Sequence, residues 1–346
     1  MPVYTPTTVI YCPVMLTRLA SDKVLDAAYD WLCHRRRKYP ANNDVWTLRH
    51  RWADEKRRIQ SDLLAGNYCF DLLNRITLAN GDDIDLWSAR DALVLKALTM
   101  VLADVLPVSP RCTHIKGNGG SKAAVRQVAG RLGDNSFVIR TDVKSYYASI
   151  GHVLLMERLA VFIKDRGILS LMGQYMKRTS ERGGWFYDHN QGISLGCPLS
   201  PLMAAFFLHE LDERMERTGL FYVRFMDDFL VLAPSRWKLR WAVKAINEVL
   251  GVLELEKHPD KTFIGRIERG FDFLGYHFSR DGLTVAKATI MRFLERASRL
   301  YEQERGKPGG SPLFEVYVRG DGWDGSLLEQ LSLPTNTKTA LHGTQR

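Results

Sequence analysis

The chain has 346 residues, of which 45% are hydrophobic and 25% charged, a composition typical of a globular protein with a sizeable core. Its formal net charge of +9 permits a polyanionic partner such as nucleic acid, although it does not require one. No run of about 18 apolar residues occurs, and the N-terminus lacks a secretion signal, so neither a membrane span nor export is expected. The five cysteines are scattered and form no C-x-x-C pair, which argues against a zinc site and favours a cytoplasmic protein.

The first third of the chain is predicted to be mainly helical. Residues 1–20 show no clear period and are expected to form an arm. Apolar residues then recur at helical spacing in three segments, which are 21–38, 45–64 and 89–106. Gly66 is expected to end the second helix as its C-cap. Residues 112–127 form a glycine-rich basic loop that leads into a further helix.

Beyond residue 135 the predicted elements alternate between strands and helices, which indicates an α+β fold. A strand over 136–142 is expected to precede a helix over about 145–165. The later elements, in chain order, are a hairpin near 175–195, a helix from Ser200, a hairpin at 221–233, a helix at 236–251, short strands to Phe278 and a helix over 286–304. The polar segment 333–346 is expected to be disordered.

Two adjacent carboxylates, Asp227 and Asp228, stand in the middle of the apolar segment FYVRFMDDFLVLAP. This pattern is typical of a hairpin with its acids at the bend. Neighbouring anions in an apolar setting repel one another and favour a bound cation. A plain aspartate-rich turn would explain the dipeptide if it stood alone.

A second acid, Asp142, ends the apolar strand of SFVIRTD, 85 residues before Asp227. A lone aspartate at a strand end often serves only as a helix cap. Antiparallel pairing of this strand with the later hairpin, however, would bring Asp142 next to Asp227. Oxygen ligands arranged in this way suit two Mg²⁺ ions, which favour an in-line phosphoryl displacement.

These segments resemble, in order and over roughly residues 45–280, the polymerase motifs of the bacterial reverse transcriptase family, which includes group II introns, retrons, diversity-generating retroelements and phage-defence enzymes. The resemblance implies that Asp142 and Asp227 are the two metal-binding aspartates, with Asp228 beside them and Val143 as a further ligand. FMDD stands where the family usually has Tyr-x-Asp-Asp. The implied cofactor is a pair of Mg²⁺ ions, or Mn²⁺.

The resemblance also implies residues that contact the incoming nucleotide. Tyr147, five residues after Asp142, matches the aromatic steric gate that rejects a ribose 2′-hydroxyl. Gln191 and Gly192 open a segment, QGISLGCPLSP, that is expected to contact the nascent base pair. Ser200 is expected to cap the following helix, with Pro201 at its first position.

Further residues are assigned by the same resemblance. Lys261 matches a lysine that helps pyrophosphate to leave. The segment FDFLGYHFS resembles the hairpin that holds the primer, and its residues Phe273, Leu274, Gly275 and Tyr276 are the predicted primer and template contacts. The basic helix after residue 284 is expected to straddle the duplex as a thumb.

The usual triphosphate-gripping stretch of the fingers is altered in this sequence. Arg75 remains, but Asp82, Asp83 and Asp85 follow it and would repel a triphosphate. Lys116 and Lys122, in the glycine-rich loop, are the alternative phosphate contacts. That loop does not match a Walker A sequence, so an ATPase has little support.

The resulting prediction is a right-handed polymerase fold of class α+β. Its expected divisions are an arm and fingers over 1–135, a palm over 136–283, a helical thumb over 284–332 and a tail over 333–346. The expected activity is RNA-directed DNA synthesis from a primer 3′-hydroxyl and deoxynucleoside triphosphates, in a retroelement or defence system. An accessory protein or non-coding RNA is a further possible partner, and zinc, H-N-H or ribonuclease H-like patterns are not found.

Three alternatives remain at this point. An untemplated or protein-primed polymerase of the same fold would be distinguished by the sequence of its product. A non-catalytic RNA-binding scaffold would have no need of clustered acids. A palm-type nucleotidyl cyclase would lack the segments around Gln191 and Phe273.

Overall fold

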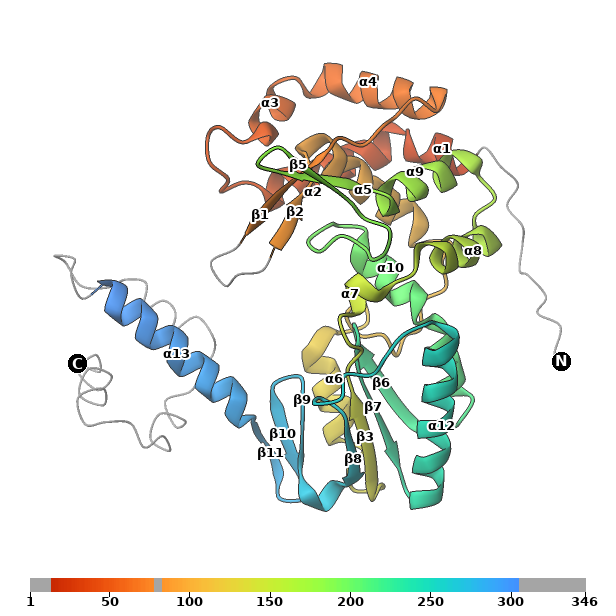
Figure 1. The fold of residues 1–346 in the computed structure, drawn as a ribbon, viewed down its shortest axis with the longest axis vertical. Helices are drawn as coiled ribbons and strands as arrows, with labels where there is room; N and C mark the ends of the chain where they lie inside the picture. Colours follow the sequence, from red (N-terminus) through yellow and green to blue (C-terminus); the bar gives the residue numbers. More distant parts are fainter. Residues whose placement is uncertain (1–13, 78–82, 305–346) are drawn as a thin grey trace. The chain divides into compact units, whose positions relative to one another are not determined.

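The computed structural model describes residues 14–77 and 83–304 (Figure 1). The chain divides into two compact units, one of residues 1–274 with 278–282 and one of residues 275–277 with 283–346. In the first unit, a continuous core of buried apolar residues runs from Leu19 to Leu255 and joins its helices to both of its four-stranded sheets. Within the described ranges, no helix is long and apolar enough to cross a membrane.

The N-terminal helices pack around one apolar helix. They are α1 (Val14–Leu19), α2 (Asp22–Arg35), α3 (Asp44–His50), α4 (Trp52–Ala65) and α5 (Ala89–Leu102). Because α5 is apolar on nearly every face, it is buried against α1, α2 and α3. Gly66 ends α4 with φ +72°, which confirms the predicted C-cap.

Two predictions in this region are wrong. Residues 14–19 form a helix rather than an arm, and Leu19 is fully buried. The single helix expected over 45–64 is broken at Arg51, which ends α3 and precedes α4. The break allows Leu48 and Ile59 to enter the same core from two differently directed helices.

A small four-stranded sheet follows these helices along the chain. Its strands are β1 (Leu73–Thr77), β2 (Asp83–Leu86), β4 (Thr179–Arg182) and β5 (Trp185–Asp188). The order is β2-β1-β4-β5, so β5 is an outer strand. The β1–β2 and β4–β5 pairs are antiparallel hairpins, whereas β1 and β4 are parallel.

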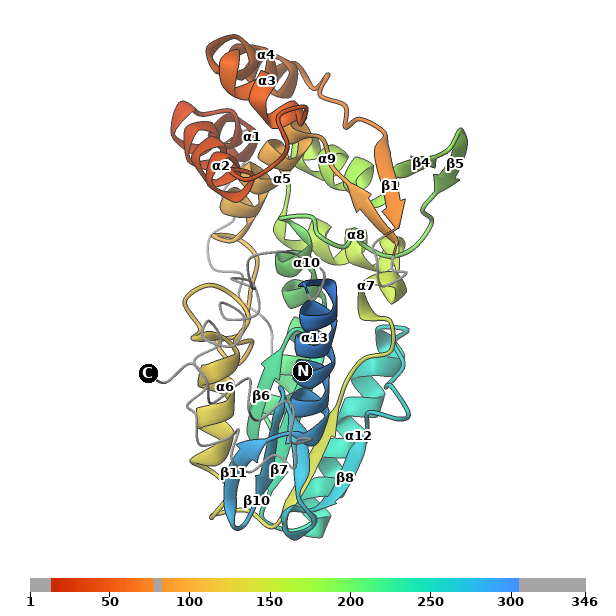
Figure 2. The same cartoon turned by 90° about the vertical axis from the view of Figure 1, so that its left-hand side faces the viewer.

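The second four-stranded sheet is fully antiparallel and has the order β6-β7-β3-β8. Its strands are β3 (Phe137–Thr141), β6 (Phe221–Phe225), β7 (Asp228–Ala233) and β8 (Phe263–Arg266). The inner strand β7 is buried at every residue after the first, as its unbroken apolar sequence requires. Helix α12 (Arg236–Val252) packs on β7 and β3, and α6 (Gly120–Ala129) contacts β6, so the two helices flank the sheet in Figures 1 and 2.

Five short helices occupy the chain between β3 and β6. They are α7 (Tyr146–Ser149), α8 (His152–Phe162), α9 (Arg166–Met176), α10 (Ser200–Phe207) and α11 (His209–Glu216). The helix expected over 145–165 is thus interrupted at Ile150, and α9 was not predicted. The predicted cap at Ser200 is also wrong, because Leu199 precedes the helix and the Ser200 hydroxyl instead donates to the Ser194 carbonyl at 2.5 Å.

The chain then passes through η1 (Ile267–Arg269), β9 (Phe271–Phe273), β10 (Tyr276–Ser279), β11 (Gly282–Val285) and α13 (Lys287–Glu304). The predicted final helix over 286–304 is confirmed as α13. The rest of the predicted thumb and the predicted disordered tail lie outside the described residues. The boundaries of fingers, palm and thumb stay predictions.

Candidate active site

Two strand ends bring three carboxylates together. The β6–β7 ladder pairs Phe225 with Asp228 and leaves Met226 and Asp227 as the turn between them. Strand β3 pairs antiparallel with β7, and its last pair joins Thr141 to Phe229. One residue further along this register, Asp142 lies level with Asp228. The predicted antiparallel pairing is confirmed, and it was the feature on which the proximity of the acids depended.

The turn that carries Asp227 has a strained backbone. Met226 has φ +58°, a left-handed conformation that a residue with a side chain adopts only when its surroundings enforce it. Arg224 Nη1 donates to the Met226 carbonyl at 2.8 Å, and the Met226 N–H donates to His114 Nδ1 at 3.0 Å. Both polar backbone groups of Met226 are therefore held by side chains behind the turn.

Arg224 is itself fixed by a fully buried ion pair. Its Nε donates to Asp212 Oδ1 at 2.7 Å and its Nη2 to Asp212 Oδ2, while neither side chain has any exposed surface. Nη2 also donates to the Ala205 carbonyl at 3.1 Å. Burial disfavours the charged guanidinium, but the carboxylate of Asp212 outweighs burial and raises the pKa of Arg224 well above its ordinary value.

His114 connects the catalytic turn to α10. Its Nδ1 accepts the Met226 N–H, so its Nε2 must be the nitrogen that donates to the Pro201 carbonyl, at 3.1 Å. Only the neutral ring with its proton on Nε2 makes both bonds. Burial lowers the pKa of His114 and thereby favours this neutral form.

We expect His114→Leu to lower kcat for primer extension by about a hundredfold, because small displacements of reacting groups have effects of this size. His114→Asn keeps an acceptor within reach of the Met226 N–H and should retain most of the activity that His114→Leu loses. Steady-state kinetics on one primer–template measures both variants. Equal losses in the two variants would show that the ring only fills space.

The three carboxylates carry an unfavourable density of negative charge. Burial, and then the proximity of Asp142, with which it shares a proton when protonated, raise the pKa of Asp227 to about 7. Burial raises the pKa of Asp228 to about 7, with Arg140 opposing and Asp142 adding to the shift. Two basic side chains offset the charge, since Lys261 Nζ lies 2.5 Å from Asp142 Oδ2 and Arg140 Nε lies 3.8 Å from Asp228 Oδ1.

Tyr147 lies beside this acidic cluster. Burial, and then the charge of Asp227, raise the pKa of Tyr147 to about 12, so its hydroxyl stays protonated and its ring lies near that carboxylate. The Tyr147 carbonyl accepts the Ile193 N–H at 2.7 Å. The tyrosine is thereby tied to the loop that follows β5, although its role as a steric gate stays a prediction.

Gln191 and Gly192 pack directly against α7. The Gly192 N–H donates to the Ile150 carbonyl at 2.9 Å, and Gln191 Nε2 donates to the Ser149 carbonyl at 3.0 Å. Gly192 has φ +81°, and an added Cβ would lie 2.9 Å from the Tyr147 carbonyl oxygen. Only glycine permits this close approach. The structure thus brings Tyr147, Gln191 and Gly192 together beside Asp227.

A family model described as "Reverse transcriptase (RNA-dependent DNA polymerase)" matches residues 90–278, more than half of the chain. The matched segment contains the three carboxylates, Tyr147 and the Gln191 loop. This chain belongs to the reverse transcriptase family. The predicted fold class and enzyme class are thereby confirmed.

Relatives of this reverse transcriptase are found among bacterial proteins. It is 24% identical over 285 residues to protein YkfC of Escherichia coli (strain K12), covering 67% of this chain and 73% of YkfC. It is 23% identical over 214 residues to the group II intron-encoded protein LtrA of Lactococcus lactis subsp. cremoris, covering 60% of this chain and 35% of LtrA. A chain of the solved partial Cas6-RT-Cas1–Cas2 complex aligns with a TM-score of 0.41 and 19% identity, over 69% of this chain and 43% of that chain.

The carboxylates of this reverse transcriptase fit divalent metal ions, which its family generally uses. Asp142 Oδ1 and Asp228 Oδ1 are buried and receive no hydrogen bond from a donor group. The raised pKa values of Asp227 and Asp228 show the charge that a cation would neutralise. In the ranges that the structure describes, no three His, Cys, Asp or Glu side chains already form a closed metal cage. Lys261 instead engages one oxygen of Asp142, and Val143 follows in an isolated bridge to Lys257.

The residues predicted to grip the triphosphate lie in two different places. Arg75 is engaged by its own sheet, since its Nε lies 3.0 Å from Asp85 Oδ1 and its Nη2 lies 3.0 Å from His189 Nε2. Asp85 therefore neutralises Arg75 as well as opposing a triphosphate. Lys116 and Lys122 are exposed on the glycine-rich loop and the start of α6. The structure does not unite Arg75 with the two lysines, and triphosphate binding by any of them stays a prediction.

The predicted primer contacts surround a tight turn between β9 and β10. Leu274 has φ +48° and Gly275 has φ +85°, the left-handed pair that a two-residue hairpin turn requires. Phe273 is fully buried, and Tyr276 opens β10. The boundary between the two compact units passes between Leu274 and Gly275. Their contact with a primer stays a prediction.

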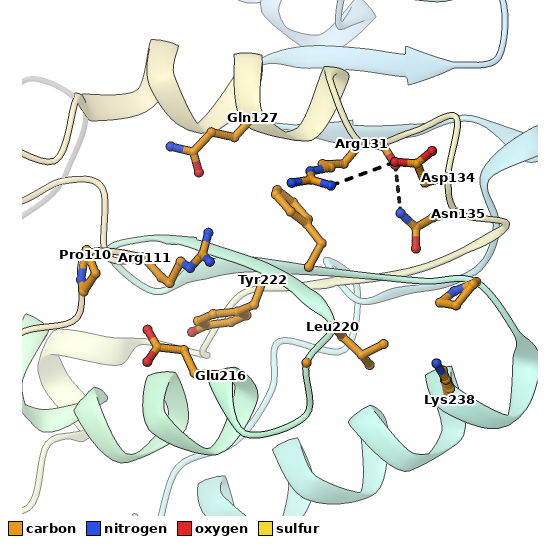
Figure 3. Close-up of a pocket in the computed structure, with 13 residues that line it drawn as sticks. Pro110, Arg111, Gln127, Arg131, Asp134, Asn135, Glu216, Leu220, Tyr222 and Lys238 are labelled. Atoms are coloured by element: carbon orange, nitrogen blue, oxygen red, sulfur yellow. Dashed lines mark hydrogen bonds and ion pairs between the residues drawn. The ribbon is translucent and has the colours of Figure 1, made fainter.

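A cavity of about 960 Å³ lies elsewhere in the first unit, and none of the three carboxylates lines it. Figure 3 shows Arg111, Arg131 and Tyr222 at its wall, with Glu216 below them. Its acids already have partners, because the Ser109 hydroxyl donates to Glu216 at 2.8 Å and Arg131 pairs with Asp134 at 3.9 Å. We therefore assign the chemistry to the clustered carboxylates rather than to the larger hollow.

Sequence reasoning missed the residues that hold the catalytic turn, namely His114, Asp212 and Arg224. One signal was available, because Arg224 interrupts the otherwise apolar strand FYVRF two residues before Met226. A basic residue in a buried strand requires a buried acid as its partner. Nothing in the sequence pattern indicated which acid that would be.

Proposed function

We propose that this reverse transcriptase copies an RNA template into DNA by joining deoxynucleotides to a primer 3′-hydroxyl, with two divalent ions held by Asp142, Asp227 and Asp228. The observation that carries the proposal is the β3–β7 register, which brings these buried carboxylates together with unpaired oxygens. Bound Mg²⁺ would supply Lewis-acid stabilisation of the attacking and leaving oxygens. The natural setting that fits its relatives is a bacterial retroelement or defence system.

In the proposed reaction, the primer 3′-oxygen forms a bond to the α-phosphorus and the bond to the pyrophosphate oxygen breaks. The 3′-hydroxyl loses its proton, and pyrophosphate leaves. Lys261, half-exposed beside Asp142, supplies a positive charge or a proton to the leaving group. Tyr147 excludes a ribose 2′-hydroxyl by contact, and the Gln191–Gly192 backbone supports the nascent base pair.

The test is primer extension by the purified full chain with Mg²⁺ and deoxynucleotides on two RNA templates that differ in sequence. We expect each product to be complementary to its own template, and little product when ribonucleotides replace deoxynucleotides. Products that ignore the template would show an untemplated polymerase. Binding of RNA without any incorporation would show a scaffold.

A further inference from the structure

The β4–β5 hairpin exposes an aromatic strand. Trp185, Phe186 and Tyr187 are consecutive in β5 and are 73%, 64% and 43% exposed. The turn Gly183–Gly184 has φ values of +59° and +86°, which makes the hairpin tight. Figure 2 shows the hairpin projecting beyond β1, and β5 is the outer strand of its sheet. Exposed aromatic rings gathered on one strand indicate a binding surface.

The two faces of β5 differ in chemistry. Side chains alternate along a strand, so Trp185 and Tyr187 share one face and Phe186 lies on the other. Trp185 is opposite Arg182 in the β4–β5 register, and Tyr187 is opposite Ser180. Arg75, from β1, places its guanidinium 5.1 Å from the centre of the Tyr187 ring. One face therefore presents two aromatic rings with two arginines beside them.

Local charges favour an anionic ligand on this face. Asp85 is the acid nearest to Arg75, and it also lies 3.7 Å from Arg178 Nε. The two other acids of the hairpin are engaged at its edges, where Glu181 accepts the Gly184 N–H at 2.6 Å and Asp188 accepts the Thr179 hydroxyl at 2.7 Å.

The aromatic face is joined to the proposed nucleotide contacts. Only four residues separate Tyr187 from Gln191, which limits the distance along the chain to about 14 Å. His189 fixes the connection, because its N–H donates to the Arg178 carbonyl at 3.1 Å and its Nε2 lies 2.9 Å from the Ser180 hydroxyl. A strand that reaches the base pair supported by Gln191 can therefore also reach this face.

We propose that Trp185 and Tyr187, flanked by Arg182 and Arg75, form a stacking platform for unpaired bases of single-stranded RNA. The occupant is the part of the template that has not yet been copied, so this inference rests on the proposed function. Aromatic rings stack on any base and arginines attract the phosphates, a combination typical of single-strand binding without sequence preference. The platform would hold the template just ahead of the nascent base pair.

The experiment measures the affinity of the full chain for labelled primer–templates whose RNA overhang is absent, short or long, at one salt concentration and without deoxynucleotides. We expect affinity to rise with the overhang. In Trp185→Ser/Tyr187→Ser, the gain from the overhang should fall roughly ten- to hundredfold, with affinity for the blunt duplex unchanged. The matched control is Trp237→Ser, which removes a 77% exposed tryptophan from α12 and should leave every affinity unchanged.

The proposal is overturned if the overhang adds no affinity to the unchanged protein, or if the double variant keeps the full gain. It is also overturned if the double variant instead converts a dimer into a monomer, because β5 would then be a protein interface. Thermal unfolding of each variant confirms that it is folded. Since the assay needs no catalysis, overhang binding without extension would reject the proposed function and leave the platform standing. Normal extension with unchanged overhang binding in the double variant would do the reverse.

Discussion

Replacing Asp227 with asparagine is expected to reduce primer extension by roughly a thousandfold or more, because metal ions held by these acids supply several kcal/mol of transition-state stabilisation. The asparagine keeps the size of the side chain and removes only the charge. Single-turnover extension on an RNA template measures the loss directly. Glu256→Gln is the matched control, since its carboxylate is 79% exposed and it should leave the rate near that of the unchanged enzyme.

The same substitution should have the opposite effect on the stability of the metal-free protein. The folded-state pKa values of Asp227 and Asp228 are about 7, well above the ordinary aspartate value of about 4. The folded state therefore binds more protons between these values, and its stability falls as the pH rises from about 4 to about 7. At pH 8 without metal, Asp227→Asn should raise the melting temperature.

Divalent ions should reverse that order. Adding Mg²⁺ at pH 8 should stabilise the unchanged protein, because the ion binds the folded acids, and should stabilise Asp227→Asn much less. Thermal unfolding with and without Mg²⁺ tests both expectations. A metal-free Asp227→Asn that melts lower than the unchanged protein at pH 8 would contradict the inferred charge repulsion.

Removing the carboxylate of Asp212 is expected to cost about 3–5 kcal/mol of folding free energy, because it leaves the buried Arg224 without its counter-charge. Asp212→Ala should show this loss in urea unfolding. Glu248→Ala is the control for an exposed pair, since it removes the partner of Arg214 at 3.3 Å and should cost less than about 1 kcal/mol.

A double variant separates stability from activity. Asp212→Leu/Arg224→Met removes both charges, so it should recover much of the stability that Asp212→Ala loses. It also removes the donor to the Met226 carbonyl, so its catalytic rate should remain low. Full recovery of activity together with stability would show that Arg224 does not hold the catalytic turn.

The sequence by itself determined the catalytic acids and their immediate elements. The apolar strand before Asp142 and the hairpin around Asp227 follow from alternation and from turn chemistry, which depend on neighbouring residues. Helix α12 follows in the same way from apolar residues at helical spacing, among them Leu239, Ala242 and Ile246. The antiparallel pairing of β3 with β7 could also be expected, because it is the arrangement that places the acids together.

Only the tertiary structure decided what surrounds those acids. His114 meets Met226 across 112 positions of sequence, and Lys261 meets Asp142 across 119. Arg75, expected to bind a triphosphate, is instead paired with Asp85 on the neighbouring strand, and α1 is a helix because Leu19 enters a core made by later segments. Local patterns encode the period of each element, whereas these partners depend on which elements pack together. That packing is settled by burial of apolar surface and by the need of each buried charge for a partner.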